Sequence, residues 1–148
     1  MMTIDESARR LGELVWTECA LFELLGRWVA TTPEPAVKVA FSHASRLHGD
    51  HAVALAALLP DTRDHDPQAL VGPSGDLAGA LDAAGRATTT AERLDALHHG
   101  LAGGQRRALE AYLGDAAAVR DGPGIRVVAV VLAEDRAGFE GLRRLGVL

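Results

Sequence analysis

The sequence has little of what several common protein classes require. Cys19 is the only cysteine in 148 residues, so no disulfide can form within the chain, which fits a reducing compartment. Aromatic residues make up 4% of the chain, and arginine supplies every positive side-chain charge except that of Lys38. A net charge of −5 offers no basic face for phosphates, so we expect no nucleic-acid partner.

Membrane and secretion signals are also missing. The longest aliphatic run, residues 127–133, is far too short to span a bilayer. The polar, acidic start of the chain lacks the basic and then apolar layout of a secretory signal. We therefore expect a cytoplasmic protein without a membrane partner.

Hydrophobic residues, by contrast, make up 48% of the chain and are mostly alanine and leucine. A chain of this length can bury a core of its own, so we expect one domain over residues 1–148. Small and unbranched apolar side chains favour closely packed helices. The predicted fold class is all-α.

The first predicted helix runs from Thr3 to about Ala30. It begins with a capping box between Thr3 and Glu6. Apolar residues then recur in steps of three and four, as the inward face of a bundle helix requires, and Glu18 takes one of these positions. A second apolar flank indicates that the helix is covered on two sides, and it consists of Leu14, Leu21, Leu24 and Trp28.

A second helix is predicted from Pro33 to about Leu59, with Thr32 as its cap. The same spacing places His48 and His51 on its inward face. Equal counts from the turn put Glu18 and His48 at the same height, because both helices rise equally per residue.

Two further helices are predicted after a long connection. Residues 60–73 resemble a loop, residues 74–85 a short helix, and residues 89–119 a third long helix that begins with a capping box. Its inward positions are Leu94, Leu97, Leu101, Ala108 and Tyr112, with His98 and Gln105 close to them. About thirty residues between helices two and three imply a long crossover.

The fourth predicted helix spans residues 125–145 and ends at Gly146. Residues 125–133 could instead form a buried strand, but the sequence continues in helical spacing and no other strand is present to pair with it. Asp135 falls on the inward face of this helix, and Glu134 lies on its flank.

These positions predict a candidate metal site made of Glu18, His48, His51 and Asp135 or Glu134. Imidazoles at i and i+3 share a helical face and can converge on one ion. Two histidines and one carboxylate leave open positions, as non-haem iron oxygen chemistry requires, although zinc accepts the same donors. Two other interpretations remain open: a hydrogen-bonded polar cluster without a metal, and metal-free acid–base chemistry by a histidine.

Two helical hairpins, a long crossover and mid-bundle acids and histidines resemble the ferritin-like superfamily. Its members hold two iron or manganese ions with a Glu on the first and third helices and Glu-x-x-His on the second and fourth. Here Glu18 matches the first position and His48-x-x-His51 replaces the second motif. Glu110, the only acid at a suitable height on helix three, points away from the inward face, and Ala137 stands three residues after Glu134.

The resemblance implies a ferritin-like four-helix bundle with an atypical metal centre. The expected function is an oxidative or redox enzyme that acts on a small molecule, with iron as the expected metal and manganese or zinc as alternatives. The rival hypothesis is a metal-free binding or structural module. Trp16 and Trp28 lie outside the inward face of helix one, which favours a homodimer.

Overall fold

The computed structural model describes residues 2–116 and 122–146 of the chain. Within these ranges the secondary structure is helical apart from one isolated bridge between Thr62 and His65, which confirms the all-α prediction and excludes a strand at residues 125–133. The helices are α1 (Ile4–Thr31), α2 (Pro35–Ala56), α3 (Pro67–Leu70), α4 (Gly75–Gly85), α5 (Thr90–Asp95), the π-helix η1 (Ala96–Leu101), α6 (Ala102–Ala116) and α7 (Gly122–Leu145).

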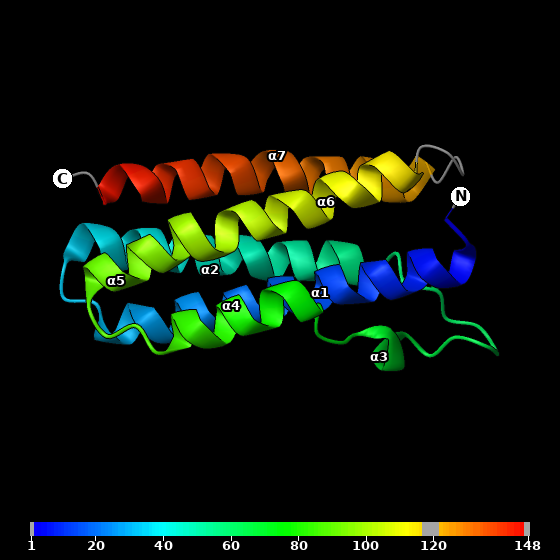
Figure 1. Ribbon diagram of the computed structural model, residues 1–148, viewed down its shortest axis with the longest axis horizontal. Coiled ribbons are helices and arrows are strands. Elements are labelled where there is room, and N and C mark those ends of the chain that lie inside the picture. Colours follow the sequence, from blue (N-terminus) through cyan, green and yellow to red (C-terminus); the bar gives the residue numbers. More distant parts are fainter. Residues whose placement is uncertain (1, 117–121, 147–148) are drawn as a thin grey trace.

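Four long rods form the body of the molecule, namely α1, α2, the run from α5 through η1 to α6, and α7 (Figure 1). α1 and α2 make an antiparallel hairpin; α5, η1 and α6 form one continuous rod, and α7 runs back along it. α2 ends near the start of α1, and the connection through α3 and α4 returns the chain along the bundle before α5 begins. The long crossover predicted from the sequence is therefore present.

The hairpin turn differs from its prediction. Pro35, not Pro33, occupies the first turn of α2, and Glu34 is the residue before it. Thr32 instead closes α1: its buried hydroxyl donates to the Trp28 carbonyl (2.7 Å) and accepts from Arg93 Nη1 (3.0 Å). A hydroxyl with two buried partners is not available to cap the next helix, so α2 starts later.

Other helix ends also shift. α2 ends at Ala56 rather than Leu59, because the backbone N–H groups of Leu58 and Leu59 bond three residues back and tighten the chain into turns. α7 starts at Gly122, earlier than the predicted residue 125, and Pro123 suits the first helical turn. Residues 117–119, predicted as the end of helix three, lie outside the described residues.

The π-helix changes which residues of the third rod face inward. Leu97, Leu101, Gln105 and Leu109 are all buried and lie four residues apart. In a regular α-helix, twelve residues advance about 120° beyond three full turns, so the first and last would not share a face. One additional residue in a π turn removes about 100° of that rotation. Leu109 therefore faces the core where the regular pattern predicts Ala108.

The crossover covers α1 closely. A Cβ atom on Gly12 would lie 1.9 Å from the Leu70 carbonyl oxygen, so only glycine permits this approach of α3. Three residues of the predicted second flank of α1, Leu21, Leu24 and Trp28, pack in one cluster with Leu77 and Leu81 of α4, whereas Leu14 belongs to a second cluster. Trp28 is buried in that cluster, 5.4 Å from the Phe41 ring. Trp28 therefore gives no support to a homodimer.

The core consists of two apolar clusters separated along the bundle. One contains the buried apolar residues within 21–28 of α1 and 37–44 of α2, and the other contains those within 2–15 and 55–59. In the third rod and α7, the buried residues within 94–101 and Leu142 belong to the first cluster, and those within 109–116 and 128–131 belong to the second. None of the helices in the described parts of the chain is long and apolar enough to cross a membrane. What lies between the two clusters is polar.

Candidate metal centre

One polar layer lies between the two apolar clusters, and each long rod contributes to it. α1 supplies Glu18, α2 supplies His48 and His51, α6 supplies Gln105, and α7 supplies Asp135. None of these five residues is more than 4% exposed. A buried polar group costs free energy unless it is paired, so a layer of five needs an explanation.

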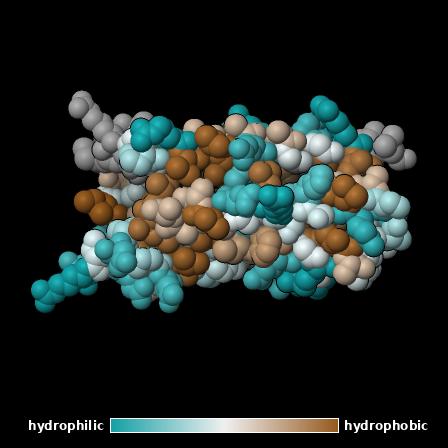
Figure 2. Space-filling model, turned by 180° about the vertical axis from the view of Figure 1, so that it is seen from behind, coloured by the Kyte–Doolittle hydropathy of each residue, from teal (hydrophilic) through white to brown (hydrophobic). Residues whose placement is uncertain are grey.

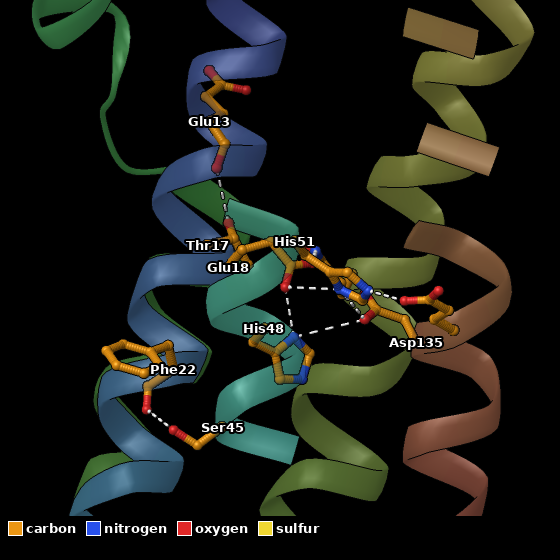
Figure 3. A network of polar contacts seen from close by, with 10 residues as sticks. Glu13, Thr17, Glu18, Phe22, Ser45, His48, His51 and Asp135 are labelled. Atoms are coloured by element: carbon orange, nitrogen blue, oxygen red, sulfur yellow. Dashed lines mark hydrogen bonds and ion pairs between the residues drawn. The ribbon is translucent and has the colours of Figure 1, made fainter. Parts of the chain in front are cut away.

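Four of these side chains point at one another (Figure 3). Nδ1 of His48 lies 2.5 Å from Oε2 of Glu18 and 3.6 Å from Oδ1 of Asp135. Nδ1 of His51 lies 3.5 Å from the same Glu18 oxygen and 3.1 Å from the same Asp135 oxygen. The predicted level match of Glu18 with His48, and the inward position of Asp135, are confirmed.

Hydrogen bonds account for only part of this layer. Nδ1–H of His48 donates to Glu18, which also accepts from Gln105 Nε2 (2.7 Å). Both carboxylate oxygens of Asp135 and the Nδ1 of His51 are buried without a hydrogen-bond partner, since the close His51–Asp135 approach is not aligned for one. Two unsatisfied anionic oxygens beside an imidazole nitrogen are the arrangement that a cation would complete.

The spacing suits one ion. The four ligand atoms, one each from Glu18, His48, His51 and Asp135, all lie within 4.8 Å of one another. Tetrahedral bonds of about 2.0–2.1 Å place ligand atoms about 3.4 Å apart, and octahedral ones about 3.0 Å apart. Three of the four distances above, 3.1, 3.5 and 3.6 Å, lie near these values. The short His48–Glu18 distance is that of their hydrogen bond.

Glu134 lies outside the group of four and forms a hydrogen bond with His51. Nε2–H of His51 donates to Oε2 of Glu134 at 2.7 Å, and the Glu134 side chain is 47% exposed. The opposite ring nitrogen, Nδ1, faces Glu18 and Asp135. A histidine that binds a metal through one nitrogen commonly donates from the other to a carboxylate, which fixes its ring and tautomer.

The same environment perturbs the ionisation of the layer. Burial alone would raise the pKa of Glu18, but its contacts with His48 and His51 outweigh it and lower the pKa to about 2. Burial lowers the pKa of His51, and the Asp135, Glu18 and Glu134 carboxylates outweigh it and raise the pKa to about 10. Burial raises the pKa of Asp135 to about 6, against the opposing effect of His51. Without a metal, the proton on His51 therefore supplies the positive charge near the acids.

The remaining sequence candidates lie elsewhere. Glu110 is exposed and pairs with Arg136, as its outward phase predicted. His43 is exposed on α2. His98, which the sequence placed toward the core, is exposed, because the π-helix alters the phase of this rod.

Gln105 is the residue of the layer that sequence reasoning did not assign to the site. A regular helical face through Ala108 leaves it at the margin, whereas the π-helix turns it inward onto Glu18. The repeated four-residue spacing from Leu97 to Leu109 is the signal that could have identified it. In the third rod, a neutral amide thus occupies the layer in place of the expected acid.

Comparisons of the chain with protein-family models, with curated proteins and with solved structures give no match. We therefore infer the function from the four long rods, the crossover and the buried cluster of Glu18, His48, His51 and Asp135.

Proposed function

We propose that the protein holds one divalent transition-metal ion between Glu18, His48, His51 and Asp135. The observation that carries this proposal is the pair of buried Asp135 oxygens that lack a hydrogen bond, although the Nδ1 atoms of His48 and His51 lie 3.6 and 3.1 Å from Oδ1. Two ionised carboxylates and two neutral imidazoles carry a charge of −2, which one divalent ion neutralises. A buried site of zero net charge avoids the cost of an unpaired ion.

A single ion fits better than two. Paired metal ions in enzymes lie about 3.5–4 Å apart and share a larger set of carboxylates. Here the third rod offers the neutral Gln105, and Glu110 is engaged with Arg136 on the surface. We therefore interpret the bundle as a ferritin-like scaffold with a mononuclear centre in place of the usual dinuclear one.

We further propose that the ion is iron and that the protein is a redox enzyme for a small molecule. Four protein ligands leave two of the six positions that iron prefers open to other molecules, whereas four-coordinate zinc would close the site. Dioxygen is the oxidant we propose: two electrons and two protons leave the substrate, and the dioxygen becomes hydrogen peroxide. Manganese and zinc remain the competing ions in the test below.

The competing hypothesis is a metal-free polar cluster in a binding or structural module. It explains Glu18, which accepts hydrogen bonds from His48 and Gln105. It does not explain Asp135, whose buried oxygens make no hydrogen bond, because the Nδ1 of His51, 3.1 Å from Oδ1, is not aligned to donate one. The metal hypothesis accounts for both carboxylates.

The test is metal affinity, measured by competition with a chelator for iron(II), manganese(II) and zinc(II). His48→Ala and His51→Ala remove ligands, and His43→Ala is the matched control because this histidine is exposed on the same helix. We expect about one ion per chain in wild type and His43→Ala, and a loss of affinity of at least about 100-fold in the other two. Equal affinities in all four proteins would overturn the proposal.

Redox activity has a separate test. The iron(II)-loaded protein should give one electron per ion to ferricyanide, and the zinc-loaded protein should give none. Iron that binds but does not react would leave a metal site without the proposed chemistry, and preferential binding of zinc would indicate a structural ion.

We also propose a homodimer, supported by a different surface from the one the sequence suggested. Hydrophobic side chains gather toward one end of the face shown in Figure 2. α2 and α7 expose Val53 (72%) and Val130 (55%), and these helices pack together. Val53→Asp should dissociate the dimer in sedimentation velocity without a loss of helical signal. A wild-type protein that stays monomeric at high concentration would contradict the proposal.

A further inference from the structure

A pocket of about 390 Å³ opens beside the candidate metal centre, between the third rod and α7. Asp135 lines it, and Phe139, another lining residue, packs its ring 5.8 Å from the ring of His48. The pocket therefore contacts one proposed metal-binding residue, Asp135, directly. The Phe139 ring separates it from a second one, His48. A molecule bound there would lie at the edge of the centre.

Two of the charged residues that line this pocket form ion pairs with residues outside it. Arg136 pairs with Glu110, and Glu140 pairs with Arg143. Arg106, which is exposed on α6 and also lines the pocket, has no ion-pair partner among residues 2–116 and 122–146. It is therefore the guanidinium group available to a ligand.

Of the remaining lining residues, only His98 is polar, and the others are apolar or small. Leu132 and Phe139 supply apolar surface from α7, and Ala102 and Gly103 leave the opposite wall without large side chains. The π-helix ends at residue 101, directly before this wall, and π segments occur frequently at functional sites. The volume lies at the low end of the range for small-molecule sites, about 300–1,000 Å³.

We propose that this pocket binds a small organic carboxylate, with its carboxylate on Arg106 and its apolar body against Leu132 and Phe139. An arginine fork matches a carboxylate with two parallel hydrogen bonds. Glu140 and Asp135 line the same pocket and would repel a doubly charged group, so a singly charged ligand fits better. This inference rests on the proposed function, because it names the substrate class of the metal centre.

The experiment measures binding of benzoate, phenylacetate and hexanoate by ligand-observed NMR, with benzyl alcohol as the uncharged analogue. Arg106→Gln removes the charge, and Arg107→Gln is the control, since this neighbouring exposed arginine does not line the pocket. Manganese-loaded and zinc-loaded protein are compared, because bound manganese speeds the relaxation of nearby ligand protons. Metal content is measured on every sample.

We expect at least one carboxylate to bind with a dissociation constant of about 1 mM or below, and Arg106→Gln to weaken it about tenfold or more. Arg107→Gln should bind as wild type, and benzyl alcohol more weakly than benzoate. Manganese should broaden the signals of the bound carboxylate.

The inference is overturned if no probe binds at about 10 mM, if the two arginine variants bind equally, or if bound manganese leaves the ligand signals unchanged. Failure of the metal centre gives a different result. In that case wild-type samples contain no metal while carboxylate binding still depends on Arg106. That result would support the carboxylate pocket and contradict the proposed metalloenzyme function.

Discussion

Replacing Asp135 by asparagine separates the metal hypothesis from the polar-cluster hypothesis. Asparagine keeps the size of the side chain and removes its charge. If Asp135 is a ligand that lacks its ion, the variant should lose metal affinity while the metal-free protein becomes more stable. If Asp135 is a structural partner of His51, the variant should be less stable.

The expected gain in the stability of the metal-free variant follows from the pKa of the Asp135 carboxyl. Burial raises it from 3.8 to about 6, so the folded protein holds the proton more tightly than the unfolded chain does. Ionised Asp135 therefore destabilises the folded protein by about 3 kcal/mol at neutral pH. Asparagine removes this penalty, and the urea midpoint should rise by about 1.5 M if the denaturant slope is about 2 kcal/mol/M.

The pH dependence has a fixed sign. The gain in unfolding free energy of Asp135→Asn over wild type should be complete above about pH 6, the folded pKa of Asp135. It should decrease between pH 6 and pH 3.8 and be absent below pH 3.8. The assay is urea unfolding followed by far-ultraviolet circular dichroism with a chelator present, at about pH 7.5 and about pH 5. Asp50→Asn is the control, because Asp50 is exposed on α2.

Two results would refute this reasoning. A metal-free Asp135→Asn protein that is less stable than wild type at neutral pH would make Asp135 a structural partner. Wild-type metal affinity in the variant would remove it from the site.

Two further predictions concern the support of the site and of α1. Gln105→Leu should weaken metal binding by about 10-fold, measured by chelator competition, because it removes the hydrogen bond that holds Glu18; unchanged affinity would deny Gln105 this role. Gly12→Ala should lower the free energy of unfolding by about 1–3 kcal/mol, because the added methyl group meets the α3 backbone. In Gly114→Ala the added methyl group meets no neighbouring side chain or element within 4 Å in the described part of the chain, so the free energy of unfolding should rise by up to about 1 kcal/mol in the same urea assay. Similar losses in both glycine variants would contradict the packing argument.

The parts of the fold that follow from regular helical spacing could be predicted from the sequence. Glu18, His48, His51 and Asp135 interrupt otherwise apolar faces at matched heights, and the structure brings all four together. Counting along two helices of equal rise is enough to predict such a layer.

What could not be predicted depends on departures from regular geometry or on tertiary contacts. The π-helix turns Gln105 toward the layer, and a straight helical face cannot show this. Trp28 is buried because α4 returns to cover α1, a consequence of the path of the crossover. The division of roles between Asp135, which faces the centre, and Glu134, which bonds to the outer nitrogen of His51, depends on side-chain directions.

The presence of a single iron ion in the polar layer is tested most directly by the anomalous scattering of crystals grown from iron-loaded protein. We expect one peak per chain at the iron edge, between Glu18, His48, His51 and Asp135, with ligand distances of about 2.0–2.2 Å. If the polar layer shows no peak, because iron binds elsewhere or not at all, these four residues do not form an iron site. Two peaks about 3.5–4 Å apart would replace the single ion with a dinuclear centre.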